Sequence, residues 1–297
     1  MRVRKFAAID IGSNAIRLLV QNVIEAEGRE TQFKKSSLVR VPIRLGQDSF
    51  TKGIISKLNE ERMINAMKAF KLLMQVHGVE NYMACATSAM REAKNSADII
   101  EKISNEAGIN IEIIDGKKEA SIIASTDLHE LIESDKSYLY IDVGGGSTEF
   151  TIFSKGQITT SKSFKIGTVR ILNEMVDESV WQDIEQWIVM QTQNLPKLSI
   201  IGSGGNINKL HKLSNRPKGE PLSYIWLNAQ YQFLQSLSYD ERISELGLNP
   251  DRADVIIPAT RIYLYGAKWS GAKKIHVPKI GLSDGIIKTL YYNSISN

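Results

Sequence analysis

One short pattern occurs twice in this sequence and limits what the chain can fold into. An apolar run at residues 5–11 includes Asp10, and the turn GSN at residues 12–14 leads into a second run at residues 15–23. In the second half, Asp142 precedes the turn GGGST at residues 144–148 between runs of the same kind. Glycine and asparagine tolerate the positive φ of tight hairpin turns. The repetition predicts two related α/β domains in tandem.

The chain length agrees with two domains. The sequence has 297 residues, and single domains average roughly 150. We expect the first domain at residues 1–117 and the second at residues 118–283, with a terminal helix at about 284–297 that packs back on the first. Three strands followed by alternating helices and strands predict a mixed sheet with helices packed on it, and the pattern repeats in outline in the second half.

Hydrophobic spacing locates the individual elements. Met63, Met67, Phe70 and Met74 lie on one helical face, and Gly78 ends that helix. A further helix is expected to begin at residue 87. Others are expected at 96–107, 118–131, 227–237, 239–246 and 250–266, and at the C-terminus. Strands are expected at 5–11, 15–23, 32–45, 82–86, 109–114, 138–143, 149–154, 157–165, 197–201 and 275–277. Residues 214–221 are expected to form an exposed loop.

Composition excludes several protein classes. Apolar residues make up 42% and charged residues 24%, as in ordinary globular proteins. The net charge of +4 favours an anionic ligand but is too small to indicate nucleic acid. Cys85 is the single cysteine, so no internal disulfide forms, and we expect it to be buried and inert. No stretch is apolar enough to span a bilayer. We therefore expect a cytoplasmic protein without membrane or nucleic-acid partners.

Three small-residue turns are candidates for binding an anion. They are GSN at 12–14, GGGST at 144–148 and GSGGN at 202–206, the last lying between a strand and a helix. Glycines let backbone N–H groups converge on a ligand, and a helix N-terminus adds a positive dipole. Taken singly, GSN is more typical of a plain hairpin, and GSGGN fits a helix entry equally well. Three glycines in a row cost conformational entropy that a plain turn does not require, which favours a functional site.

Acidic residues beside these turns could carry the chemistry. Glu149 closes the glycine-rich turn, and Glu119 lies in the first turn of a helix, where acids are common for dipole reasons alone. A positioned carboxylate can deprotonate a water for attack on phosphorus. Asp10 and Asp142 could hold a divalent cation between two such turns.

Other chemical motifs carry less weight or are absent. Taken alone, Arg91 is more simply explained as a solvated arginine that pairs with a carboxylate than as a binding residue. Pairs of adjacent lysines in the sequence are likewise more simply explained as solvated surface. The four histidines match no metal spacing. The sequence has no P-loop, no dinucleotide-binding GxGxxG after a strand and no GxSxG elbow.

In combination, the motifs resemble those of the Ppx/GppA family of exopolyphosphatases and guanosine pentaphosphate phosphohydrolases. The resembling segments are DIGSN at 10–14, ATSAMREAKN at 86–95, GKKEA at 116–120, DVGGGSTE at 142–149, KIGTVRIL at 165–172, GSGGN at 202–206 and RADVIIPA at 252–259. This number of motifs in this order is a strong signal that covers nearly the whole chain.

The resemblance implies two RNase H-like domains of the actin-like/sugar-kinase ATPase fold with a cleft between them. It implies hydrolysis of a terminal phosphate from polyphosphate or pppGpp, with Mg²⁺ or another divalent cation. Glu119 and Glu149 would be the catalytic pair, and Asp142, with Asp10, would organise the metal. The phosphate-binding residues would be Ser13, Asn14, Thr87, Ser88, Arg91, Gly144, Gly145, Gly146, Ser147, Thr148, Gly204 and Gly205.

The sequence departs from the family pattern at a few positions. Lys118 replaces the first glutamate of an acidic pair, Asn206 stands where threonine is usual, and residues 281–285 lack the usual arginine and glutamate. The chain resembles the short two-domain form, which we expect to bind long polyphosphate more weakly. Release of terminal orthophosphate from polyphosphate is the leading hypothesis. The alternatives are pppGpp hydrolysis, a kinase or ATPase of the same fold, and a (p)ppGpp-binding regulator. Whether the chain forms a homodimer stays open.

Overall fold

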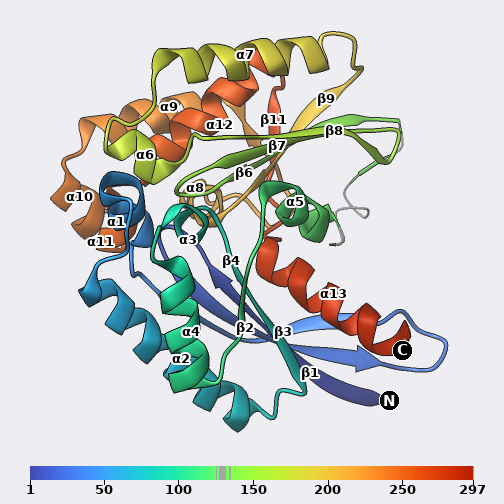
Figure 1. Ribbon diagram of the computed structural model, residues 1–297. Coiled ribbons are helices and arrows are strands. Elements are labelled where there is room, and N and C mark those ends of the chain that lie inside the picture. Colours follow the sequence, from blue (N-terminus) through green and yellow to red (C-terminus); the bar gives the residue numbers. More distant parts are fainter. Residues whose placement is uncertain (125, 127–131, 134, 297) are drawn as a thin grey trace. The chain divides into compact units, whose positions relative to one another are not determined.

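The chain forms two compact units in the computed structural model, which describes residues 1–124, 126, 132–133 and 135–296 (Figure 1). Unit 1 comprises Met1–Thr126 and Gly281–Asn297, and unit 2 comprises Asp127–Ile280. The sequence expectation divided the chain at residues 117 and 283 instead, so helix α5 (Gly116–Ala124) lies with unit 1. No helix among the described residues is long and apolar enough to cross a membrane.

Unit 1 is built on a five-stranded sheet of order β3-β2-β1-β4-β5. The first three strands are antiparallel, and β4 and β5 continue the sheet parallel to β1. The strands are β1 (Arg2–Ile11), β2 (Ile16–Glu25), β3 (Gln32–Val41), β4 (Asn81–Ala86) and β5 (Ile111–Ile113). The helices, besides α5, are α1 (Leu45–Lys52), α2 (Lys57–His77), α3 (Ser88–Glu92), α4 (Ser96–Ala107) and α13 (Leu282–Ser296). In Figure 1, α2 and α4 lie on one side of this sheet and α13 on the other.

Unit 2 repeats this plan with a six-stranded sheet of order β10-β11-β9-β6-β7-β8. Its antiparallel part is β6 (Ser137–Val143), β7 (Thr148–Ser154) and β8 (Gln157–Phe164), and the remaining strands are β9 (Leu198–Ser203), β10 (Leu222–Ser223) and β11 (Lys274–His276). The helices are α6 (Thr168–Leu172), α7 (Glu178–Thr192), α8 (Gly205–Leu213), α9 (Tyr224–Ser236), α10 (Tyr239–Ser244), α11 (Pro250–Ala253) and α12 (Ile256–Ser270). Helix α12 packs against α7, α9, β6 and β9, and its Tyr263 is fully buried.

The predicted fold class is confirmed in both units. Each has three antiparallel strands followed by two strands parallel to the first, β4 and β5 in unit 1 and β9 and β11 in unit 2, which is the arrangement of an RNase H-like domain. In unit 2, the short strand β10 adds an antiparallel edge. The hairpin expected at residues 12–14 joins β1 and β2. Met63, Met67, Phe70 and Met74 are all buried on α2, which ends at Gly78 in the left-handed conformation, as the spacing predicts.

Three expected elements differ from the structure. The run at 32–45 is not one strand, because β3 ends at Val41 and α1 begins at Leu45 after Arg44 turns the chain with φ of 62°. The helix expected at 250–266 is two helices, α11 and α12, separated by residues 254–255. The helix expected at 118–131 begins at Gly116 and is described as far as Ala124. Residues 125 and 127–131 lie outside the described part of the chain.

Cys85 lies in β4 and is fully buried, as expected. Burial, with added repulsion from nearby carboxylates, raises the pKa of its thiol to about 12. The thiolate is the reactive form of cysteine, so Cys85 is chemically inert at neutral pH.

Candidate functional site

The first predicted phosphate turn is held against the start of α1. The Ser13 carbonyl accepts a hydrogen bond from the Gly46 amide (2.8 Å), and the Asn14 carbonyl accepts one from the Arg44 amide (3.0 Å). The turn itself is closed by a bond from the Gly12 amide to the Ala15 carbonyl (3.2 Å). In a trans peptide the N–H points opposite to the C=O. The N–H groups of Asn14 and Ala15 therefore face away from α1.

Neighbouring strand ends of unit 1 bring further predicted residues to this turn. Strand β4 is parallel to β1, so its end carries Thr87 and Ser88 beside the turn. The Ser13 and Ser88 hydroxyls are buried and hydrogen-bonded to each other (2.9 Å), and Thr87 bonds Ile11 through its amide (3.1 Å). Thr87 occupies the N-cap position of α3 without a side-chain capping bond. The hydroxyls of Ser13 and Ser88 thus help to fix the turn.

Arg91 and Glu119 lie at the next strand end of the same unit. A guanidinium nitrogen of Arg91 donates to the Ile114 carbonyl oxygen (2.7 Å), just before α5. The sequence favours a carboxylate partner for Arg91, whereas this hydrogen bond is to a backbone carbonyl. Glu119 stands in the first turn of α5, as expected, and is half-buried. Arg91 therefore ties α3 to the segment that leads into Glu119.

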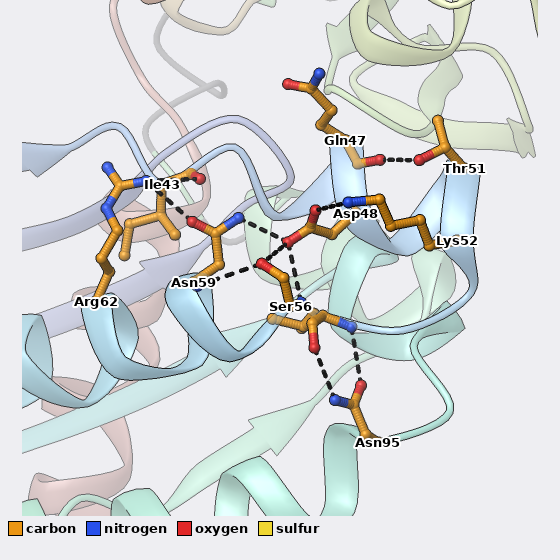
Figure 2. A network of polar contacts seen from close by, with 10 residues as sticks. Ile43, Gln47, Asp48, Thr51, Lys52, Ser56, Asn59, Arg62 and Asn95 are labelled. Atoms are coloured by element: carbon orange, nitrogen blue, oxygen red, sulfur yellow. Dashed lines mark hydrogen bonds and ion pairs between the residues drawn. The ribbon is translucent and has the colours of Figure 1, made fainter.

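A polar network around Asp48 fixes α1, which holds the first turn (Figure 2). The buried Asp48 carboxylate accepts hydrogen bonds from the Ser56 amide (3.0 Å), the Ser56 hydroxyl and the Asn59 side chain (2.7 Å). Asn95 bonds both the amide and the carbonyl of Ile55 (2.9 Å each). Burial alone would raise the pKa of Asp48, but hydrogen bonds from Ser56 and Asn59 lower it below its usual range. The network joins α1, the start of α2 and the end of the ATSAMREAKN segment.

We expect the Asp48→Asn variant to lose about 2 kcal/mol of unfolding free energy at pH 7, because hydrogen bonds to a charged acceptor are replaced by weaker ones. A carboxyl whose pKa is lowered on folding stabilises the fold above its unfolded pKa of roughly 3.9, and this stabilisation is lost as pH falls through the folded pKa. The difference between wild type and variant should therefore shrink below about pH 4. Urea unfolding at a series of pH values measures this difference in unfolding free energy, and Glu101→Gln, at an exposed glutamate, is the control. A difference that does not change with pH would contradict the charge argument.

The second predicted turn, in unit 2, is held in the same way by α6. The carbonyls of Gly144 and Gly145 accept from the amides of Thr168 (3.0 Å) and Val169 (2.9 Å). The Gly146 carbonyl accepts from the buried side chain of Arg170 (2.7 Å). The turn is closed by a bond from the Gly144 amide to the Ser147 carbonyl (3.0 Å), which matches the bond from Gly12 to Ala15.

This arrangement gives the glycine turn the backbone geometry of an anion cradle. Because three successive carbonyls point toward α6, the amides of Gly145, Gly146 and Ser147 point the opposite way. A row of inward-turned N–H groups is a site for phosphate oxygens. Gly167 makes the close packing possible, since a Cβ at this position would lie 2.4 Å from the backbone of Gly145.

Glu149 lies directly beside this cradle on β7 and is only 3% exposed. One carboxylate oxygen accepts hydrogen bonds from the hydroxyls of Ser147 and Ser163, both at 2.8 Å. Thr148 is fully buried, and its hydroxyl donates to the Ile166 carbonyl (2.6 Å). Glu149 is thus held in one orientation, while the Thr148 hydroxyl fastens the turn to the segment that precedes α6.

The third predicted turn meets the second at the ends of two parallel strands of unit 2. Residues 142 and 203 are partners in the register of β6 and β9. Gly204 has φ of 112°, and a Cβ there would lie 3.1 Å from the Val143 carbonyl oxygen and 3.5 Å from a carboxylate oxygen of Asp142. Gly205 is the first residue of α8. The buried Tyr263 hydroxyl donates to the Ser203 carbonyl, and burial, reinforced by Asp142, raises its pKa well above the usual value. Asp142, the cradle and the third turn are therefore close together.

The expected metal ligands Asp10 and Asp142 belong to different units. Asp10 is buried and already paired with Arg17 (3.1 Å) across the β1–β2 hairpin. Burial raises the pKa of Asp10, although Arg17 partly opposes this. Among the residues that the structure describes, no three His, Cys, Asp or Glu side chains are grouped so that they could hold a metal ion.

The sequence matches the Ppx/GppA phosphatase family over residues 26–293. The chain is a member of the Ppx/GppA family. It is 29% identical to exopolyphosphatase 2 of Mycobacterium tuberculosis, over 86% of this chain and 88% of that protein. It is also 29% identical to a bifunctional 3-dehydroquinate synthase/phosphatase of Fusobacterium nucleatum, of which it covers 42% of the length. It spans about half, 49%, of exopolyphosphatase 1 of Mycobacterium tuberculosis, to which it is 26% identical.

Solved structures agree on the fold of this family member. The Ppx/GppA protein of Aquifex aeolicus has a TM-score of 0.77 at 23% identity, with 99% of both chains covered. An exopolyphosphatase of Cytophaga hutchinsonii has a TM-score of 0.82 at 24% identity, with 98% of both chains covered.

The residues that clamp the turns in this Ppx/GppA protein were not among the predicted site residues. In unit 2 these are Gly167 and Arg170, and in unit 1 they are Arg44 and Gly46. The signal for the first pair was present in the KIGTVRIL segment, which follows β8 and contains α6. For the second pair, the sequence offers no glycine motif comparable to the turns themselves.

Proposed function

We propose that this chain releases terminal orthophosphate from inorganic polyphosphate. The observation that carries the proposal is the amide cradle of Gly145, Gly146 and Ser147 beside the buried carboxylate of Glu149. A backbone cradle suits a phosphoryl group, and a fixed carboxylate beside it suits activation of water. Family membership supports a phosphohydrolase, and relatives named as exopolyphosphatases favour polyphosphate as the substrate.

In the proposed reaction, a water molecule attacks the terminal phosphorus. The water oxygen forms a new bond to phosphorus as the bridging P–O bond breaks, and the chain shortened by one unit leaves with the bridging oxygen. Glu149 accepts the proton that the water loses. Phosphoryl transfer is accelerated mainly by positioning and electrostatic stabilisation, which the amides of the cradle provide without reorganisation.

We assign the remaining predicted residues to binding or positioning in this reaction. Glu119 is proposed as the second catalytic carboxylate, a role that rests on the family resemblance. Thr87, Ser88, Arg91 and Thr148 are proposed to position the binding segments, given their internal hydrogen bonds. The proposed phosphate contacts are Ser13, Asn14, Gly145, Gly146, Ser147, Gly204 and Gly205. Gly144, expected from the sequence to bind phosphate, is proposed to position the turn, because its N–H and C=O groups both make hydrogen bonds within the protein. Asp10 and Asp142 are proposed to hold a divalent cation, a role that the family resemblance implies.

Phosphate release tests the proposal directly. Purified protein is assayed with polyphosphate, pppGpp and ATP at matched phosphate-end concentrations, with Mg²⁺ or with EDTA. We expect the highest kcat/KM with polyphosphate and loss of activity in EDTA. A higher kcat/KM for pppGpp would move the assignment to the pppGpp phosphohydrolase alternative. Acceptor-dependent consumption of ATP would indicate a kinase instead. Tight (p)ppGpp binding without hydrolysis of any substrate would indicate a regulator.

A further inference from the structure

Unit 2 contains a cavity of about 370 Å³ whose lining is strongly basic. Helix α8 contributes one side of it, and the segments around residues 247–252 and residue 279 contribute the rest. The lining residues are Asn208, Lys209, Lys212, Gly247, Leu248, Asn249, Arg252 and Lys279. Four of these eight described residues are cationic and none is acidic. A concave site with one sign of charge concentrates ligands of the opposite sign.

The cations are placed by the helix geometry and by backbone contacts. Asn208, Lys209 and Lys212 are neighbours on one face of α8, since residues three and four apart lie together on a helix. The Lys209 ammonium is held by the carbonyl oxygens of Leu246 (3.0 Å) and Gly247 (3.3 Å). Burial lowers the pKa of Lys209, and the positive charges of Lys212 and Arg252 lower it further. Crowding of like charges costs free energy that a bound anion would relieve.

The helix that begins at the third glycine turn also lines the cavity. Helix α8 begins at Gly205, and the Asn208 amide bonds to the Gly204 carbonyl (3.3 Å) one turn further on. At ~1.5 Å rise per residue, Lys212 lies roughly 12 Å along the helix from Gly204. A single orthophosphate cannot contact both places, whereas an extended chain of phosphoryl groups can.

We propose that this cavity is a second anion subsite, which takes phosphoryl groups of an extended phosphate chain beyond the group held at the glycine turns. The inference rests on the proposed function, because it assumes that a phosphate chain occupies the turns. Two sources share this chemistry: the inner units of inorganic polyphosphate, and the second phosphate cluster of a nucleoside polyphosphate such as pppGpp. Lys212 and Lys279 are the exposed cations of the lining and are the residues to test.

The experiment compares the double variant Lys212→Gln/Lys279→Gln with the matched control Lys268→Gln/Lys273→Gln. The control removes two exposed lysines of the same unit that do not line the cavity. Dissociation constants for long-chain polyphosphate, tripolyphosphate and pppGpp are measured by calorimetry at several salt concentrations. Glu149→Gln is added to every variant so that ligands are not consumed.

We expect the cavity variant to bind long-chain polyphosphate about 10-fold more weakly than the control, with tripolyphosphate changed by less than about 2-fold. The slope of log affinity against log salt should fall by about 1.5, because two phosphate contacts no longer release counterions. A selective loss for pppGpp instead would support the subsite with the nucleotide as its source. Equal affinities of the cavity and control variants for all three ligands would overturn the proposal. If wild type releases no phosphate but the cavity variant still binds the chain more weakly, the hydrolase proposal fails and the subsite stands.

Discussion

Replacing Glu149 by glutamine should lower kcat for phosphate release by about 10²- to 10⁴-fold, the range for loss of a general base. Glutamine has nearly the same shape, and its amide oxygen can still accept the hydroxyls of Ser147 and Ser163. The fold should therefore persist, and KM should change only a few-fold. Initial rates of orthophosphate release over a range of polyphosphate concentrations, together with the thermal midpoint, measure this.

The matched variant is Ser163→Ala, which removes one of the two hydroxyl bonds to Glu149 but leaves the carboxylate. It should lower kcat by less than about 10-fold, because a weakly held base is still a base. If Glu149→Gln retains wild-type kcat, the water-activating role belongs to another group. If Ser163→Ala is as inactive as Glu149→Gln, then the loss of kcat in Glu149→Gln comes from a disturbed structure and not from the loss of proton transfer.

The second large effect is expected for Gly167→Ala. The added Cβ would lie 2.4 Å from the Gly145 carbonyl group, a distance at which backbone must move. The variant should lose about 1–3 kcal/mol of unfolding free energy through overpacking. Displacement of the cradle by about 1 Å should lower kcat/KM by about 10²-fold, since misplaced binding groups no longer hold the reacting atoms in line. Urea unfolding and phosphate release measure the two effects separately.

Gly281→Ala is the control for the general effect of adding a methyl group to glycine. A Cβ there meets no atom within 4 Å, and its φ is not in the left-handed region. We expect wild-type kcat/KM and a loss of at most about 1 kcal/mol of unfolding free energy, because Gly281 is the N-cap of α13, where alanine is less favourable than glycine. Wild-type activity of Gly167→Ala would show that the turn does not depend on its clamp to α6.

Sequence patterns predicted the parts of the fold that depend on local signals. Glycine turns between apolar strands indicated both hairpins, and the spacing from Met63 to Met74 indicated α2. Glu119 could be assigned to a first helical turn because it follows a strand and a glycine. The same signals located the two turns that the structure brings together in unit 2, since both follow parallel neighbouring strands.

The parts that sequence reasoning missed are determined by distant contacts. Helix α1 starts after Arg44, a non-glycine residue in the left-handed conformation. Its position depends on Ser13, which is far from it in sequence, and on Ser56 and Asn59, which lie beyond its C-terminal end. Similarly, nothing local to Gly167 indicates that it contacts Gly145. Such packing constraints become visible only when both segments are placed in the three-dimensional structure.

The clamped turns also bear on how far relatives of this chain can diverge. A cradle made of peptide groups is specified by the course of the main chain and not by the identity of the side chains. Substitutions around it are tolerated wherever the new atoms find room, and only a few positions, such as Gly167, forbid even a methyl group. Such a cradle can therefore outlast extensive sequence drift.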